Sequence, residues 1–128
     1  MKKFALVGLF ILLAFVSLSY AGKKQATNPC ANPQNTIEMR ECESKNMKEA
    51  DAELNKIYKQ LMSRIDKNQK DKLKAAELAW IKYRDAHCEF EASFYEGGTM
   101  QPQVHSSCLR AMTEKRTKEL QEVLNGMG

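Results

Sequence analysis

Residues 70–95 read KDKLKAAELAWIKYRDAHCEFEASFY, and this stretch decides the fold class. Its apolar residues recur at intervals of three and four, which is typical of an α-helix. They form two stripes rather than one: the first contains Leu73, Ala76, Trp80, Tyr83, His87 and Phe94, and the second contains Leu78, Ile81, Cys88, Ala92 and Tyr95. We therefore expect a helix over about residues 70–95 that packs between two neighbours.

The segments on both sides of this stretch also have helical spacing. A helix over about 36–66, with Thr36 as its N-cap, is predicted by Met47, Ala50, Leu54, Ile57, Tyr58, Leu61 and Ile65. A helix over about 105–124 is predicted by Leu109, Met112, Leu120 and Val123. The polar segment 66–71 is expected to form the first turn, and Gly97, Gly98 and Pro102 the second. The predicted fold is all-α: a small disulfide-stapled bundle of three to four helices, with the second helix in the middle.

The N-terminus has the pattern of an export signal. Lys2 and Lys3 precede an apolar run over residues 4–18, and Ser19-Tyr20-Ala21 places small residues where a signal peptidase cuts. We expect a signal peptide over 1–21, an extended arm over 22–35 and a helical domain over 36–128. The apolar run is shorter than the roughly 20 residues of a transmembrane helix. The expected product is periplasmic or secreted, without a membrane span.

Size and charge exclude several functions. Two of the 20 Lys and Arg residues lie in the signal, so 18 remain against 16 Asp and Glu, and the formal charge falls to about +2. That charge is too small to predict nucleic-acid binding. The remaining 107 residues form one domain, which excludes a multidomain enzyme.

Four cysteines follow the predicted signal: Cys30, Cys42, Cys88 and Cys108. An even number in a small exported chain predicts two disulfides, for which three pairings exist. We favour Cys30 with Cys42 and Cys88 with Cys108, because each pair closes a short loop that contains turn residues. Asn28-Pro29 before Cys30 does not match the small residue that precedes a lipidated cysteine, so no lipid anchor is expected.

The same region offers zinc ligands, namely His87, Cys88, His105 and Cys108. A tetrahedral site is the alternative to the disulfide, but adjacent residues rarely bind one ion and export favours oxidation of the thiols. We therefore expect no metal and no cofactor. Neither histidine has a serine or free cysteine partner at a spacing that indicates nucleophilic catalysis, so the chain is not predicted to be an enzyme.

Aromatic and charged residues on the inward faces complete the predicted interior. Tyr58, Trp80, Tyr83 and Phe94 are assigned to an aromatic core, whereas Phe90 and Tyr95 flank the main stripe and are candidates for exposed contact residues. Asp85 and Arg116 fall on apolar faces and need partners. We expect a buried polar seam in which they are satisfied by each other, by Arg84, or by Asp51 and Asn55.

Several spaced motifs resemble the LprI-like lysozyme inhibitor family. They begin with Cys30, Thr36, Met39 and Cys42, and continue with Ala50-Asp51-x-x-Leu54-Asn55-x-x-Tyr58-x-x-Leu61. Next come Ala79-Trp80-Ile81-x-Tyr83-Arg84-Asp85-Ala86-x-Cys88 and Gly97-Gly98-Thr99, and last Cys108-Leu109-x-x-x-Thr113-x-x-Arg116-x-x-x-Leu120. The resemblance covers nearly all of the chain after the signal. It implies an exported, disulfide-bonded helical domain that inhibits lysozyme.

An inhibitor of this kind needs a rigid element that enters the lysozyme cleft. The loop over 96–107 is suited to this role, since two glycines allow close approach and the favoured disulfide limits the entropy lost on binding. The predicted partner-binding residues are Gly97, Gly98, Thr99, Gln101, His105 and Ser106. The alternative function is an envelope interaction module without lysozyme inhibition, which binds another exported protein, or an anionic cell-wall polymer through the basic tip at 67–74.

Overall fold

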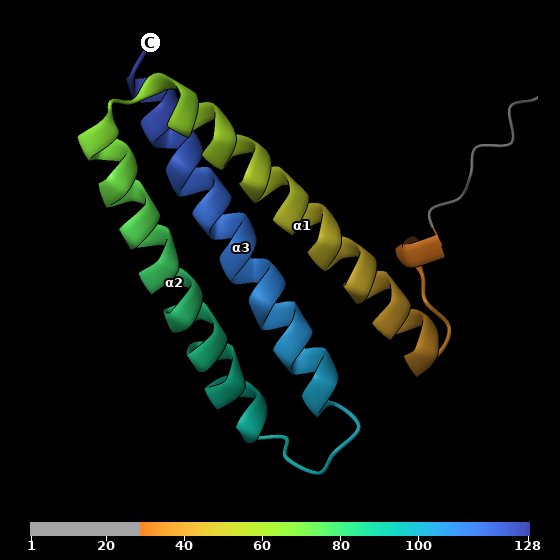
Figure 1. Cartoon of the computed structure of the whole chain (residues 1–128). Coiled ribbons are helices and arrows are strands. Elements are labelled where there is room, and N and C mark those ends of the chain that lie inside the picture. Colours follow the sequence, from red (N-terminus) through yellow and green to blue (C-terminus); the bar gives the residue numbers. More distant parts are fainter. Residues whose placement is uncertain (1–28) are drawn as a thin grey trace, which may run out of the picture.

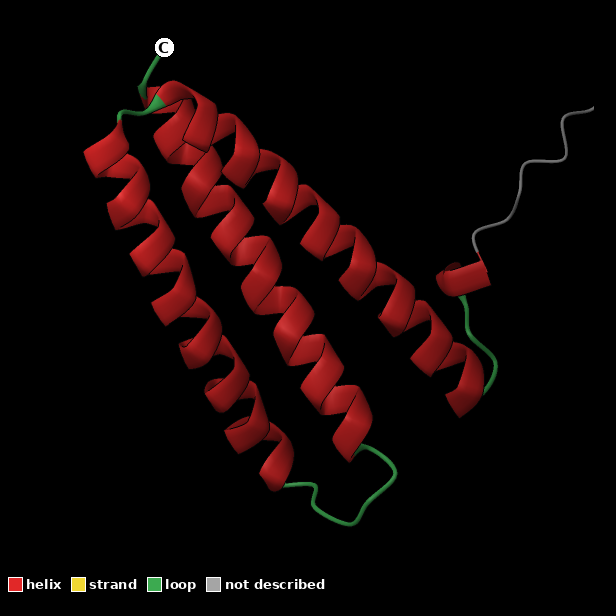
Figure 2. Cartoon of the chain, viewed as in Figure 1, coloured by secondary structure: helices red, strands yellow, loops and turns green. Residues whose placement is uncertain are grey.

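The computed structural model describes residues 29–128, and within them the chain is helical (Figure 2). A short 3-10 helix, η1 (Pro29–Ala31), precedes three long helices: α1 (Thr36–Arg64), α2 (Lys67–Ser93) and α3 (Gln101–Gly126). The described range contains no strand, so the all-α fold class is confirmed. The predicted signal over 1–21 and the first part of the predicted arm, residues 22–28, lie outside the described residues.

Polar side chains cap the first two helices: α1 begins at Thr36, as predicted, and α2 begins at Lys67, three residues before its predicted start. Asn35, and not Thr36, is the N-cap of α1: its Oδ1 accepts hydrogen bonds from the backbone N–H groups of Ile37 and Glu38, at 3.0 and 2.9 Å. At α2, Asp66 and Gln69 form a capping box in which each side chain accepts from the other's backbone N–H. Only Ile65 and Asp66 separate α1 from α2, so most of the polar segment 66–71 is helical rather than a turn.

The third helix begins at Gln101, four residues before its predicted start. Pro102 was expected to keep this segment from becoming helical, and this expectation was wrong. Proline is tolerated in the first turn of a helix, where the missing N–H would have no helical partner. As a result residues 101–104 are helical too, and His105 and Ser106 lie in the second turn of α3 rather than at its start.

The middle position belongs to α3, which runs back between α1 and α2 and contacts both (Figure 1). The expectation that the second helix is central was therefore wrong. The face of α2 that meets α3 lies between the two predicted stripes: it includes Leu73, Glu77, Trp80, Arg84, Cys88 and Ala92. Leu73 and Trp80 of the first stripe and Cys88 and Ala92 of the second thus belong to one contact face. The stripe residues farther from this face remain exposed.

This arrangement corrects half of the predicted aromatic core. Tyr58 and Trp80 are partly buried against the core, whereas Tyr83 of α2 and Phe94, the residue that caps the C-terminal end of α2, are 61% and 74% exposed. Phe90 and Tyr95 are also exposed, as the alternative interpretation proposed. Tyr83 and Phe94 remain in water because α2 has one close helical neighbour instead of two.

The apolar core occupies the end of the bundle beside the α1–α2 turn. It is formed by Leu54, Ile57 and Leu61 of α1 with Leu120 and Leu124 of α3. Burial of each such leucine stabilises the fold by roughly 2 kcal/mol. The opposite end, where α2 connects to α3, is therefore held mainly by other means. None of the helices within 29–128 has the length and apolarity needed to cross a membrane.

Both favoured disulfides are present. Cys88 of α2 is bonded to Cys108 of α3, with a Cα–Cα distance of 5.5 Å, and Cys30 of η1 is bonded to Cys42 of α1, with a Cα–Cα distance of 5.3 Å. The first bridge joins two long helices at the end that lacks the leucine core. The second joins η1 to α1, the helix that η1 contacts.

Candidate functional site

The turn that connects α2 to α3, residues 94–100, has a defined conformation. Gly97 has a φ of +74°, a left-handed value that favours glycine. The Gly98 N–H donates to the Tyr95 carbonyl at 3.0 Å, and the Gly97 N–H donates to Oε1 of Gln101 at 3.3 Å. Arg40 of α1 donates to the Thr99 carbonyl across the bundle at 3.4 Å. The turn is therefore tied to both α1 and α3.

The Cys88–Cys108 disulfide closes this segment as a covalent loop. It spans 20 residue steps, and Cys88 is fully buried. In the loop-entropy description such a bridge restricts the unfolded chain by about 3 kcal/mol. We call residues 94–100, held by this bridge, the clamped turn. A segment restricted in this way loses little further freedom when it binds a partner.

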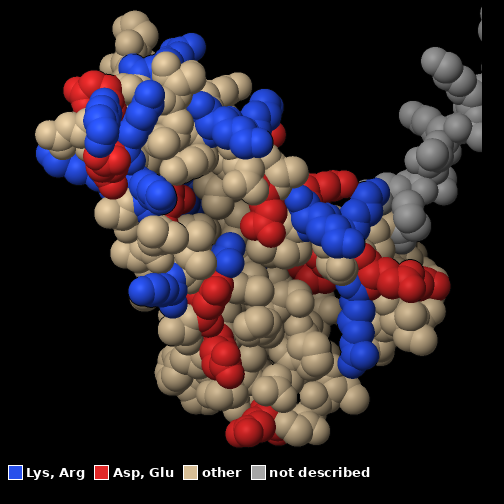
Figure 3. All heavy atoms as spheres, in the orientation of Figure 1, with Lys and Arg blue, Asp and Glu red and all other residues tan. Residues whose placement is uncertain are grey.

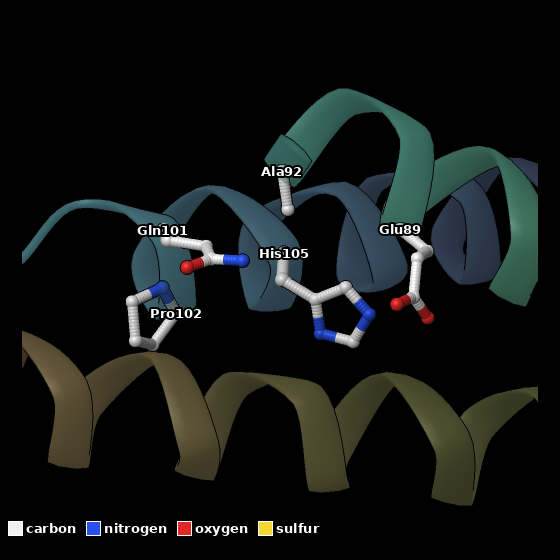
Figure 4. A pocket seen from close by; sticks show the side chains of 5 residues that line it. All are labelled: Glu89, Ala92, Gln101, Pro102 and His105. Carbon is white, nitrogen blue, oxygen red and sulfur yellow. The ribbon is translucent and has the colours of Figure 1, made fainter. Parts of the chain in front are cut away.

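A shallow hollow of about 300 Å³ lies beside the clamped turn (Figure 4). It is lined by Glu89 and Ala92 of α2 and by Gln101, Pro102 and His105 of α3. The His105 ring and the Glu89 carboxylate point into the same space. The hollow therefore offers a hydrogen-bonding ring, an amide and a carboxylate to a partner group, but it is too open to enclose a small substrate.

The predicted partner-binding residues are divided between these two features. Gly97, Gly98 and Thr99 lie in the turn and are exposed, Gln101 and His105 line the hollow, and Ser106 is half-buried on α3. The prediction of a loop over the whole of 96–107 was wrong, since its second half is helical. The exposed loop available to a partner is accordingly shorter and stiffer than the sequence indicated.

Charge is distributed unevenly between the two ends of the bundle (Figure 3). Residues 85–109, around the clamped turn, contain Asp85, Glu89, Glu91 and Glu96 and no Lys or Arg. The other end carries seven Lys and Arg residues within 56–74, against Asp66 and Asp71. A chain of small net charge thus has an acidic, aromatic-rich end and a basic tip, and each can attract a different partner.

The predicted polar seam is only partly assembled. Arg84 is its centre: the guanidinium donates to Asp85 at 2.9 Å and to Oγ1 of Thr113 at 3.2 Å, and it lies 3.8 Å from the Asp51 carboxylate. It also lies over the Trp80 ring at 5.1 Å. Asp85 and Asn55 are exposed rather than buried, because the sides of α2 and α1 that carry them do not meet α3.

Arg116 has a partner that the sequence reasoning missed. It pairs with Glu77 of α2 and with Glu119, not with Asp85. A second missed pair joins Arg110 of α3 to the buried Glu43 of α1 at 2.7 Å. Both glutamates follow the helical spacing of the inward faces: Glu43 precedes Met47 by four positions, and Glu77 precedes Trp80 by three. That signal was present in the sequence.

These pairs change the acidity of both arginines. Hydrogen bonds to Glu43 and to Glu114 raise the pKa of Arg110 above its ordinary value. Burial lowers the pKa of Arg116, but the hydrogen bonds to Glu77 and Glu119 outweigh it, so the net change is a raised pKa. Both side chains therefore stay charged at any physiological pH and act as fixed links between helices.

One group of potential metal ligands occurs in the described part of the chain: His87, Glu91 and Cys108, whose donor atoms lie within 4.8 Å of one another. The Cys108 sulfur is bonded to Cys88 and has no thiolate to offer a metal. His87 instead contacts Glu91 at 3.1 Å and stacks on Tyr83. This arrangement favours the structural role of the disulfide over the zinc alternative.

Comparison with known proteins gives one family. The chain matches the family described as Lysozyme inhibitor LprI over residues 26–120. It is also 32% identical, over 117 aligned residues, to an uncharacterized protein of Rhizobium meliloti (strain 1021), with 81% of this chain and 84% of that protein covered. No solved structure was found to match the chain.

Proposed function

The chain belongs to the LprI lysozyme inhibitor family, and we propose that it is an exported protein that binds a lysozyme and covers its active-site cleft with the clamped turn. The observation that carries the proposal is the turn itself, an exposed Gly97-Gly98-Thr99 tip fixed by the disulfide between Cys88 and Cys108. Family membership supports a binding and inhibitory role rather than catalysis. The signal-like segment over 1–21 supports export.

The chemistry of the lysozyme cleft fits such a tip. Lysozymes that cleave peptidoglycan place a carboxylic acid and a carboxylate on either side of the bond that breaks. The Thr99 hydroxyl, the Gln101 amide and the His105 ring are hydrogen-bond donors on or beside the turn. A narrow tip that brings these donors to the two carboxyl groups would exclude the glycan without itself being a substrate.

The charge around the tip supports the same partner. Many lysozymes are strongly basic, and the segment 85–109 that contains the tip carries four acidic residues and no Lys or Arg, with Arg40 of α1 as the one basic side chain among the described residues that is bonded to the tip. Opposite charge on two approaching surfaces speeds their encounter and fixes their orientation. The acidic end therefore gives this chain, with its small net charge, the attraction to a basic enzyme that its total charge does not provide.

Clearing of a cell-wall suspension by a basic lysozyme tests the proposal. Purified mature protein is expected to lower the rate in a saturable way at about micromolar concentration. Glu96→Lys is expected to raise the inhibitory concentration about tenfold, because it reverses a charge beside the tip. Glu122→Lys, the same change near the far end of α3, is the matched control and should leave it unchanged. A lysozyme rate that is unaffected by wild-type protein rejects the function.

A second candidate function uses the opposite end of the bundle. Lys67, Lys72 and Lys74 are exposed at the basic tip, which favours contact with an anionic wall polymer. Retention on purified wall polymer that falls with added salt would support it, and reversing Lys70, Lys72 and Lys74 to Glu should abolish that retention. These variants leave the clamped turn intact, so the two functions can be separated.

A further inference from the structure

The side of α2 that points away from the bundle carries a second apolar surface. Six exposed residues define it, and we call them the outer seam: Ala76, Ala79, Tyr83, Ala86, Phe90 and Ser93. Tyr83 and Phe90 expose 61% and 59% of their surface. In the described part of the chain α2 has α3 as its principal neighbour, and α3 packs on a different face. Exposed apolar surface of this extent marks a contact site in many proteins.

The spacing of the outer seam is that of a coiled coil. Its members follow one another at intervals of three, four, three, four and three residues, the spacing that keeps a line of side chains facing a partner helix. The seam extends over about 26 Å of helix, at about 1.5 Å per residue. None of its members is charged. The sequence pattern therefore fits a helix as the partner rather than a flat surface or a polymer.

The sizes of the seam residues indicate which helix is the partner. The seam begins with the small side chains of Ala76 and Ala79, Tyr83 lies just before its midpoint, and Phe90 lies in its second half. In an antiparallel pair of identical helices, Ala79 of one copy faces Phe90 of the other, and Tyr83 faces Ala86. Each large side chain thus meets a small one, the arrangement that packs two helices without voids or overlap.

We propose that two copies of this chain associate through α2, as an antiparallel helix pair about a two-fold axis that passes midway between Tyr83 and Ala86. Such a contact is closed by its own symmetry and needs no other component. Charge at the seam's ends agrees with this orientation. Lys72 precedes the seam and Glu96 follows it, so antiparallel packing brings each lysine near the glutamate of the other copy.

Both aromatic residues of the outer seam contact a second ring of the same copy. Phe90 and Phe94 are in edge-to-face contact with ring centroids 5.1 Å apart, and Tyr83 stacks on His87 at 5.6 Å. Rings that are held in place lose less freedom on association. In the proposed pair Phe94 extends the contact toward Ala75 of the other copy, which is also exposed.

A single helix pair is a small interface. Interfaces below about 1,200 Å² of total buried area are usually transient. We therefore expect a dimer that forms at high protein concentration and dissociates on dilution. The Gly97-Gly98-Thr99 tip and the hollow lie outside the outer seam, although Phe94 and Glu96 of the clamped turn border it, so each copy keeps its tip and its hollow accessible, at opposite ends of the pair. This inference does not depend on lysozyme binding.

Sedimentation equilibrium of the mature protein over a range of concentrations tests the proposal. The mean mass of the wild type is expected to rise from monomer toward dimer. Ala79→Glu puts a charge opposite an aromatic ring and should raise the Kd about tenfold or more. Ala52→Glu, the same change at an exposed position of α1, is the control and should have no effect. Glutamate is a good helix former, so circular dichroism should show unchanged helix content for both variants.

A charge-pair variant tests the register. Ala79→Glu and Phe90→Lys should each weaken the dimer alone, whereas the two together should restore it in part, because each glutamate then faces a lysine of the other copy. Combining Ala79→Glu with Phe94→Lys should restore the dimer less. A wild type that stays monomeric up to about 1 mM overturns the proposal. The proposal is also overturned if the wild type stays monomeric and Ala79→Glu weakens lysozyme inhibition. The outer seam would then be a contact surface for lysozyme.

Discussion

Arg116 of α3 donates two hydrogen bonds to a single carboxylate oxygen of Glu77 on α2: Nε and Nη2 both reach Oε1, with the Nε bond at 2.8 Å. Its third nitrogen, Nη1, donates to Glu119 at 2.9 Å. Glu77 is 9% exposed. The pair lies where the outer helix α2 meets the central helix, and it fixes how α2 is placed along α3.

Breaking this pair should destabilise the bundle. Glu77→Gln keeps the shape but leaves a partly buried guanidinium with Glu119 alone. Because removing one partner of a buried ion pair leaves an uncompensated charge, we expect a loss of about 2 kcal/mol. For a domain of this size that loss lowers the Tm by roughly 10 °C, measurable by circular dichroism. The double variant Glu77→Leu with Arg116→Met should lose less stability than Glu77→Gln, because it leaves no unpaired charge at this position. An equal or larger loss would contradict this explanation.

Thr113 offers a test of the Arg84 network. Its side chain is fully buried, and its hydroxyl donates to the Leu109 carbonyl at 2.7 Å while accepting from Arg84 at 3.2 Å. Thr113→Val keeps the shape and removes both bonds, so we expect a loss of about 1 to 2 kcal/mol in urea unfolding. Thr117→Val is the control. In the described part of the chain the Thr117 hydroxyl makes one hydrogen bond, to the Thr113 carbonyl, whereas the Thr113 hydroxyl makes two. Thr117→Val should therefore reduce the free energy of unfolding by less than Thr113→Val.

The two disulfides should differ in importance. Replacing Cys88 and Cys108 together with serine should reduce stability by about 3 kcal/mol, since the bridge joins α2 to α3 where the leucine core is absent. Replacing Cys30 and Cys42 releases η1, which contacts α1, so the helical core should melt at nearly the same temperature. Calorimetry of both variants checks the contrast. Equal Tm losses would show that the arm supports the core.

Gly97 should be sensitive to substitution for conformational reasons alone. Its φ of +74° disfavours a side chain, although a Cβ there would meet no atom within 4 Å. Gly97→Ala should therefore reduce stability by about 1 kcal/mol, and Gly97→Asn by less. Gly126→Ala, at the C-terminal end of α3 and also without neighbours, should be neutral or stabilising. If Gly97→Ala had no effect, the turn would not be held in this conformation.

Sequence reasoning identified elements better than it identified neighbours. The helices, their approximate bounds and both disulfide pairs could be predicted because periodicity and loop length are local properties. Pro102 was misread because a proline that interrupts a helix in its interior can begin one in its first turn. Asp85 was assigned to the interior by its spacing, yet it lies on an exposed side of α2. Spacing shows that residues share a face without showing what that face meets.

By itself, the sequence determined an all-helical chain stapled by two local disulfides, because helical periodicity and close cysteine spacing need no knowledge of the partner helix. Only the tertiary structure decided that α3 is central, that Arg116 pairs with Glu77, and that Tyr83 and Phe94 remain exposed. The physical reason is that two apolar stripes on one helix can cover either two neighbours or two edges of one neighbour. The difference depends on how three helices divide the buried surface among themselves.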